Sequence, residues 1–179
     1  MPNWCSNKVL INGPNEDMEI LIAAVISEDS SFSLAKILVP PEELLNEPSP
    51  MRDKVKAAEF IKKYGTSSWY DWQNDKWGTK WDVHATTIYD RTEVTLPGGR
   101  TVLYEFDSAW APPLPVYLAL AERFPNTNIY ACYDEPGMDF SGWCAYSKGE
   151  LVKEGTGESY DALRMYMEPS IDIFDYVLR

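Results

Sequence analysis

Strand-like and helix-like patterns follow one another along this chain in an order that few folds can satisfy. Alternating or apolar runs typical of strands are separated by residues at helical spacing and by Gly- and Pro-rich stops. The strand-like segments are residues 7–13, 83–89, 102–107 and 129–133, and the helices start near Asn15 and after Pro113. Without the residues between the first helix and the second strand, the order is β-α-β-β-α-β, the split β-α-β arrangement.

Further segments interrupt this order. Residues 27–80 form an insertion in which residues 32–39 predict a short strand and residues 69–72 a short helix or a turn. Residues 51–64 predict a longer helix, which ends at a glycine. Its expected apolar face consists of Val55, Ala58, Ile61 and Tyr64.

A hairpin and a helix follow the last strand of the β-α-β-β-α-β order. Residues 142–146 and 151–153 predict two strands joined by a turn at Lys148-Gly149, and Ser159 can cap a helix over residues 160–167. We therefore expect an α+β fold, with a ferredoxin-like sheet, a helical insertion and an extra C-terminal hairpin and helix. We expect one domain over residues 1–179, and the alternative is two small domains that divide near residue 80.

The charge of the chain bears on its partners. The formal net charge is −12, and residues 1–90 and 91–179 each contain 14 acidic residues. The negative field repels nucleic acid and suits a basic protein partner.

The start of the chain lacks the pattern of a signal peptide, its apolar runs are too short to span a membrane, and its three cysteines form no close pair. We expect a cytoplasmic protein with reduced thiols and no membrane partner.

Reactive and metal-binding constellations are not evident. One histidine, His84, and three scattered cysteines, Cys5, Cys132 and Cys144, do not provide the paired ligands of a zinc site. The acidic turn at residues 134–139 could hold a hard cation, but a solvated turn is the favoured interpretation. We predict no catalytic residue, no metal and no cofactor.

Aromatic segments are the most unusual feature, because aromatic residues make up 13% of the chain. They lie at or near element boundaries, where Trp and Tyr mixed with charged residues can bind a partner. The candidate binding residues are Trp77, Lys80, Trp81, Asp107, Trp110, Glu135 and Phe140. The alternative for each single ring is a structural role between the insertion and the sheet.

The helix predicted over residues 51–64 gathers positive charge. Its five basic residues are Arg52, Lys54, Lys56, Lys62 and Lys63. Asp53 and Glu59 lie at helix-pair distance from several of them, which favours a solvated, salt-bridged surface over a nucleic-acid site.

Four ordered motifs resemble the Api/YubB-type proteins of bacteriophages and conjugative plasmids. The motifs are Met1-Pro-Asn-Trp-Cys-Ser-Asn7, Trp77-Gly-Thr-Lys-Trp-Asp82, Phe106-Asp-Ser-Ala-Trp-Ala-Pro-Pro113 and Glu135-Pro-Gly-Met-Asp-Phe-Ser-Gly142. The resemblance runs from residue 1 to about residue 145 and implies a mobile-element origin and a ferredoxin-like domain. It implies no activity, and no catalytic role is carried over from it.

These observations favour a non-enzymatic interaction protein whose acidic surface binds a host protein, such as a defence or nucleic-acid-processing enzyme. A second hypothesis is a single-strand nucleic-acid binder that stacks bases on Trp77, Trp81 and Trp110 beside Lys80, although the net charge disfavours it. A third is an enzyme that acts through Asp107, Glu135 or Cys5 under the Pro112-Pro113 loop. An exposed sheet edge could also make a homodimer.

Overall fold

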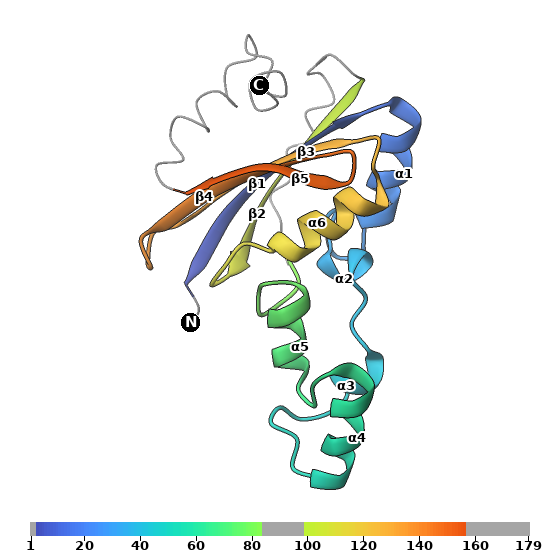
Figure 1. Ribbon diagram of the computed structural model, residues 1–179, viewed down its shortest axis with the longest axis vertical. Coiled ribbons are helices and arrows are strands. Elements are labelled where there is room, and N and C mark those ends of the chain that lie inside the picture. The colour runs from blue at the N-terminus through green and yellow to red at the C-terminus, as the bar shows by residue number, and fades with distance from the viewer. Residues whose placement is uncertain (1–2, 84–98, 157–179) are drawn as a thin grey trace.

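The computed structural model describes residues 3–83 and 99–156, and it has an antiparallel five-stranded sheet with its helices on one side (Figure 1). The strands lie in the order β2-β1-β3-β4-β5. Their bounds are β1 Trp4–Gly13, β2 Arg100–Ala109, β3 Asn128–Glu135, β4 Phe140–Ser147 and β5 Glu150–Thr156. The first strand is therefore central, between β2 and β3, and the β4–β5 hairpin widens the sheet beyond β3.

Alternation along β1 decides which face of the sheet bears the core. Val9 and Ile11 are fully buried and pair with Tyr104 and Val102 of β2. Two helices cover this face (Figure 1): α1 Asn15–Val25 and α6 Leu114–Arg123. They contribute buried residues to the same core, namely Met18, Leu21, Val25, Val116, Tyr117, Leu120 and Ala121. Apolar burial of this extent is the main stabilising contribution to such a fold.

Most of the predicted elements are confirmed. The strands expected over 7–13, 102–107, 129–133, 142–146 and 151–153, the helices expected from Asn15 and after Pro113, and the short helix at 69–72 are all present. The strand predicted over 83–89, apart from Val83, and the helix predicted over 160–167 lie outside the described residues. The complete β-α-β-β-α-β order therefore stays a prediction.

The segment 32–39 corrects one expectation, because it contains a helical turn, α2 Leu34–Ile37, instead of a strand. The side chain of Ser33, at the N-cap, makes no capping bond of its own. The cap comes instead from Asp82, which lies 48 residues further along the chain than Leu34. The apolar pattern of residues 32–39 could not predict this turn, because its hydrogen-bond acceptor, Asp82, is far away in the sequence.

The Asp82 carboxylate fastens the two ends of the insertion together, and we call this set of contacts the Asp82 clasp. Its Oδ1 accepts hydrogen bonds from the backbone N–H of Leu34 at 2.6 Å and of Val83 at 2.7 Å. Its Oδ2 accepts one from the Ser33 hydroxyl at 2.6 Å and one from the Ala35 N–H at 3.4 Å. Charged acceptors on backbone N–H groups at a helix start make strong hydrogen bonds.

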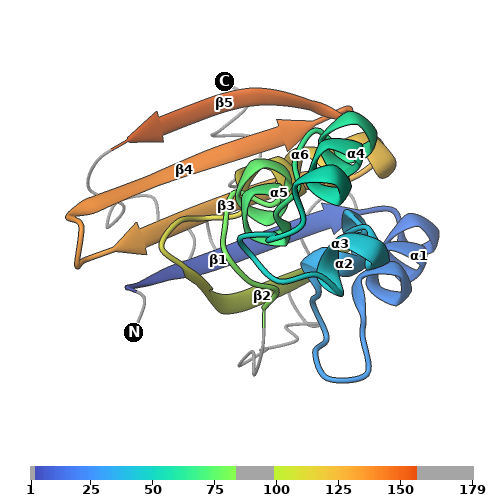
Figure 2. The same cartoon turned by 90° about the horizontal axis from the view of Figure 1, so that it is seen from below.

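Between the two ends, residues 41–80 form an arm that leads away from the sheet (Figures 1 and 2). It contains α3 Glu42–Leu45, α4 Lys54–Tyr64 and α5 Trp69–Lys76. Leu44 and Phe60 are buried within the arm but do not belong to the main core cluster. At its base, Trp77 joins the main core and donates a 2.8 Å hydrogen bond from Nε1 to the Leu38 carbonyl.

The longer helix of the arm differs from its prediction in two ways. It begins at Lys54 because the Asp53 carboxylate caps it, accepting from the N–H of Val55 at 2.9 Å and of Lys56 at 3.1 Å. Its predicted apolar face is wrong, since Val55 and Ile61 are exposed and Phe60 is the buried residue. The sequence pattern identified a helix but not the side that packs.

The Asp82 clasp predicts a specific loss of stability. In Asp82→Asn, one carboxylate oxygen becomes an NH₂ group that faces donors, so we expect the free energy of unfolding to fall by about 2–3 kcal/mol. Denaturant titration of the variant and the parent protein measures this difference. Asp29→Asn, at an exposed position, is the matched control and should change stability by less than about 0.5 kcal/mol. Equal effects of the two changes would contradict the role of the clasp.

Candidate functional site

Exposed aromatic rings meet where β1 begins and β2 ends. Trp4 pairs across the sheet with Ala109, which directly precedes Trp110. The rings of Trp4 and Trp81 lie with their centroids 6.5 Å apart at an interplanar angle of 45°. Trp4 is 51% exposed and Trp110 43% exposed, which is unusual for side chains of this size. Exposed tryptophans gathered in one place are typical of a binding surface.

A lysine and a tyrosine extend this group of rings. The Lys80 Nζ lies 4.4 Å from the centroid of the Trp81 ring and 5.6 Å from that of Tyr70. Both distances are within the range of a cation–π interaction. We call Trp4, Tyr70, Trp81 and Trp110 the aromatic patch.

The end of the insertion positions Trp81 from both sides. Two residues before it, the buried hydroxyl of Thr79 donates a 2.8 Å hydrogen bond to the Ala109 carbonyl. One residue after it, Asp82 forms the clasp to α2. Because both neighbours are fixed, the Trp81 ring is held beside Trp4 by contacts outside the patch.

The backbone at Trp110 is strained. Its φ is +74°, in the left-handed region that bulky residues rarely adopt. The Trp110 N–H donates a 3.0 Å hydrogen bond to the Asn3 carbonyl, which ties this conformation to the start of the chain. Strained backbone of this kind is found preferentially at functional sites.

Two carboxylates lie on the same side of the sheet as Trp4. Ser6, two residues after Trp4, pairs with Asp107 on β2 and with Asp134 on β3. Residues two apart along a strand share a face, and directly paired residues do as well. Both aspartates are exposed, and neither forms an ion pair within residues 3–83 and 99–156. The aromatic patch, Asp107 and Asp134 together are called the acidic aromatic surface.

The predicted binding residues divide into two groups. Lys80, Trp81, Asp107 and Trp110 lie at this end of the sheet. The other three are not part of this surface. Glu135 and Phe140 lie at the same end of the sheet but in the neighbouring β3–β4 hairpin. Trp77 corrects the expected stacking set, since its side chain is only 2% exposed and belongs to the core.

Glu135 ends β3 and Phe140 begins β4, and the two residues pair beside the turn that joins these strands. Glu135 is 1% exposed, and its Oε1 accepts a 2.9 Å hydrogen bond from the Gly137 N–H within the turn. Phe140 is half-buried, with its ring edge-on to Tyr133 at a centroid distance of 6.3 Å. Burial explains why Glu135 is not available to a large partner.

Three residues of the surface were missed by the sequence analysis, namely Trp4, Tyr70 and Asp134. The Met1-Pro-Asn-Trp start was noted only as a motif. Strand alternation could have placed Trp4 with Ser6, but the pairing of Ser6 with Asp107 and Asp134 depends on the sheet register.

The residues of the enzyme hypothesis lie near one another, since the charges of Glu135 and Asp107 act on the Cys5 thiol, but they do not share an accessible face. Cys5 pairs with Ser108 and is buried beneath the helices, and Glu135 is buried as well. Asp107 precedes Ser108 on the same strand, so its side chain lies on the opposite face of the sheet. Among the residues that the structure describes, no cluster of three or more His, Cys, Asp or Glu could hold a metal ion.

Burial also alters the chemistry of the thiols. It raises the pKa of Cys5 and of Cys132 to about 12 and that of Cys144 to about 11. A thiolate is the reactive form of cysteine, so these side chains stay neutral and unreactive near neutral pH.

The raised pKa values predict slow thiol labelling. At about pH 8, a thiol of pKa 12 has roughly a thousandth of the thiolate of an ordinary one, so native protein should react with 5,5′-dithiobis(2-nitrobenzoate) at least about 100-fold more slowly than protein in urea. The absorbance of the released thiolate measures both rates. Rapid modification of one thiol in the native protein would show an accessible, activated cysteine instead.

Three comparisons place the chain among known proteins. The family model described as "Ferredoxin-like domain in Api92-like protein" matches residues 76–170. The uncharacterized protein YubB of Escherichia coli (strain K12) is 29% identical over 94 residues, which make up 52% of this chain and 61% of that relative.

A solved structure supports the same fold. The crystal structure of a protein api92 from Yersinia pseudotuberculosis superimposes with a TM-score of 0.56 at 12% identity, covering 88% of this chain and 99% of that one. At this identity the likeness concerns the fold alone. No helix in the described parts of the chain has the length and apolar character needed to cross a membrane. With more than half of its residues matched by the family model, the chain belongs to the family of Api92-like proteins with a ferredoxin-like domain.

Proposed function

We propose that this chain is a non-enzymatic interaction protein of a phage or plasmid, and that its acidic aromatic surface binds a basic segment of a host protein. One observation supports this above all: the exposed ring of Trp4 shares a face with Asp107 and Asp134. The host protein would be one with a basic groove, such as a defence or nucleic-acid-processing enzyme.

The chemistry of the surface suits arginine in particular. A guanidinium group can stack on an indole ring while it donates hydrogen bonds to a neighbouring carboxylate. Tryptophan and tyrosine are also the side chains that most often dominate binding energy at protein interfaces. The net charge of −12 adds long-range attraction for a basic partner.

Single-stranded nucleic acid is the second candidate. Lys80 beside Trp81 and Tyr70 favours it, because a cation next to stacking rings can hold a phosphate and a base. Asp107 and Asp134 oppose it, since their charges repel the backbone phosphates. The charge balance of the surface therefore favours the basic protein segment.

The domain organisation is also an inference. We infer that residues 1–179 form a single cytoplasmic domain, with residues 27–80 inserted into a β-α-β-β-α-β sheet and with a terminal helix after the hairpin. The burial of Leu34 in the main core and the Asp82 clasp support a single unit. The three cysteines are free thiols, as a reducing compartment favours.

The test is the binding of a fluorescent deca-arginine peptide, measured by anisotropy. We expect Trp4→Ala and the double change D107N/D134N each to weaken binding by about tenfold, because each removes a stacking or ionic partner of the guanidinium groups. The matched control is E19Q/E122Q, which removes the same charge from exposed positions on α1 and α6.

A control that loses as much affinity as D107N/D134N would show that the peptide responds only to overall charge, which contradicts the proposed surface. Oligothymidylate in the same assay separates the second candidate. Tighter binding of oligothymidylate than of the peptide, lost in Lys80→Gln, would replace the protein partner by a nucleic acid.

A further inference from the structure

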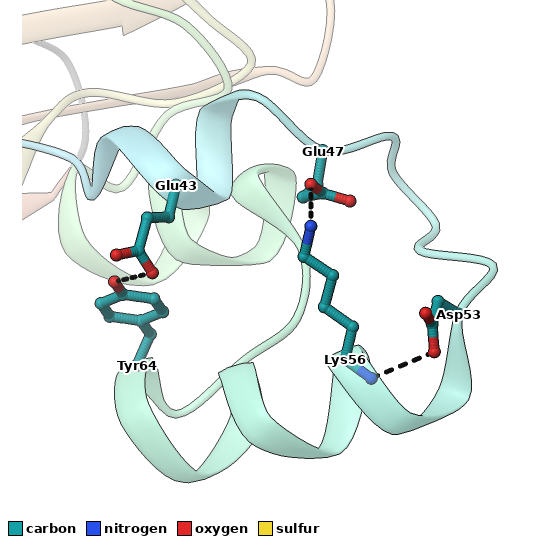
Figure 3. A network of polar contacts seen from close by, with 5 residues as sticks. All are labelled: Glu43, Glu47, Asp53, Lys56 and Tyr64. Carbon is teal, nitrogen blue, oxygen red and sulfur yellow. Dashed lines mark hydrogen bonds and ion pairs between the residues drawn. The ribbon is translucent and has the colours of Figure 1, made fainter.

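The helix α4 presents two faces of different character. Toward α3 it buries Phe60 and forms an ion pair from Lys56 to Glu47 (Figure 3). A second ion pair joins Lys63 to Glu43 at 2.8 Å. The Tyr64 hydroxyl adds a 2.9 Å hydrogen bond to Glu43. These contacts hold one side of α4 against the arm, so the other side is fixed in a direction away from it.

The outer face of α4 combines apolar and positively charged side chains. Val55 is 72% exposed and Ile61 54% exposed, although both are β-branched aliphatic residues. Lys54, Ala58 and Lys62 lie between them at helical spacing and are exposed as well. Neither lysine forms an ion pair with any residue that the structure describes. We call these five residues the outer face of α4.

Charge is distributed unevenly between the arm and the rest of the chain. Residues 41–80 contain seven acidic and seven basic residues, so the remaining residues account for the whole net charge of −12. Positions 52–63 contain five basic and two acidic residues. Two of the basic residues, Lys56 and Lys63, form ion pairs with Glu47 and Glu43. The outer face of α4 is therefore a local positive, apolar feature on an otherwise acidic molecule.

The same chain carries a surface of complementary chemistry. The acidic aromatic surface has exposed rings that Val55 and Ile61 can cover. Its two carboxylates have no ion pair with any residue of the described ranges and can receive Lys54 and Lys62. Within one molecule, α4 is far from the sheet-borne part of that surface, because α4 lies at the far end of the arm and Trp4, Asp107 and Asp134 lie on strands of the sheet (Figure 1). A contact between them requires two molecules.

We propose that the outer face of α4 docks on the acidic aromatic surface of a second copy of this chain. The proposal rests on the proposed function, because it assigns a second occupant to the same surface. The contact joins two different surfaces, so it is heterologous and extends into open chains or closes into rings. One helix face buries little area, so the association is weak and sensitive to salt.

The β5 edge of the sheet is less suited to association between two copies of the chain. The edge strand β5 carries Glu150, Lys153 and Glu154, and its pairing with β4 is irregular between Ala145 and Tyr146. Charges and bulges on an edge strand oppose pairing with another strand. The predicted homodimer is thus less well supported through β5 than contact through the arm.

Sedimentation velocity of the full chain over a range of concentrations at low salt tests the proposal. We expect the parent protein to assemble reversibly, while K54Q/K62Q and D107N/D134N each stay monomeric. An equimolar mixture of the two variants should form only one-to-one dimers, because it contains one intact pair of surfaces. The charge-exchanged chain K54E/K62E/D107K/D134K should assemble again.

The control K148Q/K153Q removes two exposed lysines outside the arm and should assemble like the parent protein. Higher salt should weaken the assembly by roughly tenfold or more. A parent protein that remains monomeric overturns the proposal, and so does assembly that K54Q/K62Q leaves intact or that D107N/D134N does not disturb. Deca-arginine binding is measured separately, so the proposed function can fail while the assembly persists, or the reverse.

Discussion

The carboxylate of Asp82 is the contact on which the arrangement of this molecule most depends. It bonds to residues at both ends of a long insertion, and so the arm can extend without separating α2 from Asp82 and Val83. The same contact fixes the residue before it, Trp81, beside Trp4 at the start of the central strand. One half-buried carboxylate thereby links the attachment of the arm to the position of a ring of the acidic aromatic surface.

The alternation of the sheet then decides what this surface can do. Asp107 and Asp134 lie with Trp4 on one face, whereas Cys5 and Glu135 are buried on the other side of the strands or in a turn. The Cys5 thiol and the exposed Asp107 and Asp134 thus lie on opposite faces of the sheet, and burial, with a smaller effect of these negative charges, opposes ionisation of the thiol. What remains accessible is a set of rings and negative charges, which favours recognition of a basic partner.

Sequence periodicity predicted most strands and the two helices that cover the sheet, because those patterns arise from local burial. It failed at residues 32–39, since the cap of that helical turn is Asp82, far along the chain. For the surface, segment composition found Trp81 but could not separate it from the buried Trp77 in the same motif. Asp134 was missed because its proximity to Trp4 exists only through strand register.

The most direct test of the account is nuclear magnetic resonance of the tryptophan indole N–H groups during titration with deca-arginine. The account predicts that the signals of Trp4, Trp81 and Trp110 shift with added peptide. The signal of Trp77, which is buried and hydrogen-bonded to Leu38, should stay in place. Peptide binding that leaves Trp4, Trp81 and Trp110 unchanged, or that moves Trp77 as much as Trp4, would contradict the acidic aromatic surface as the binding site.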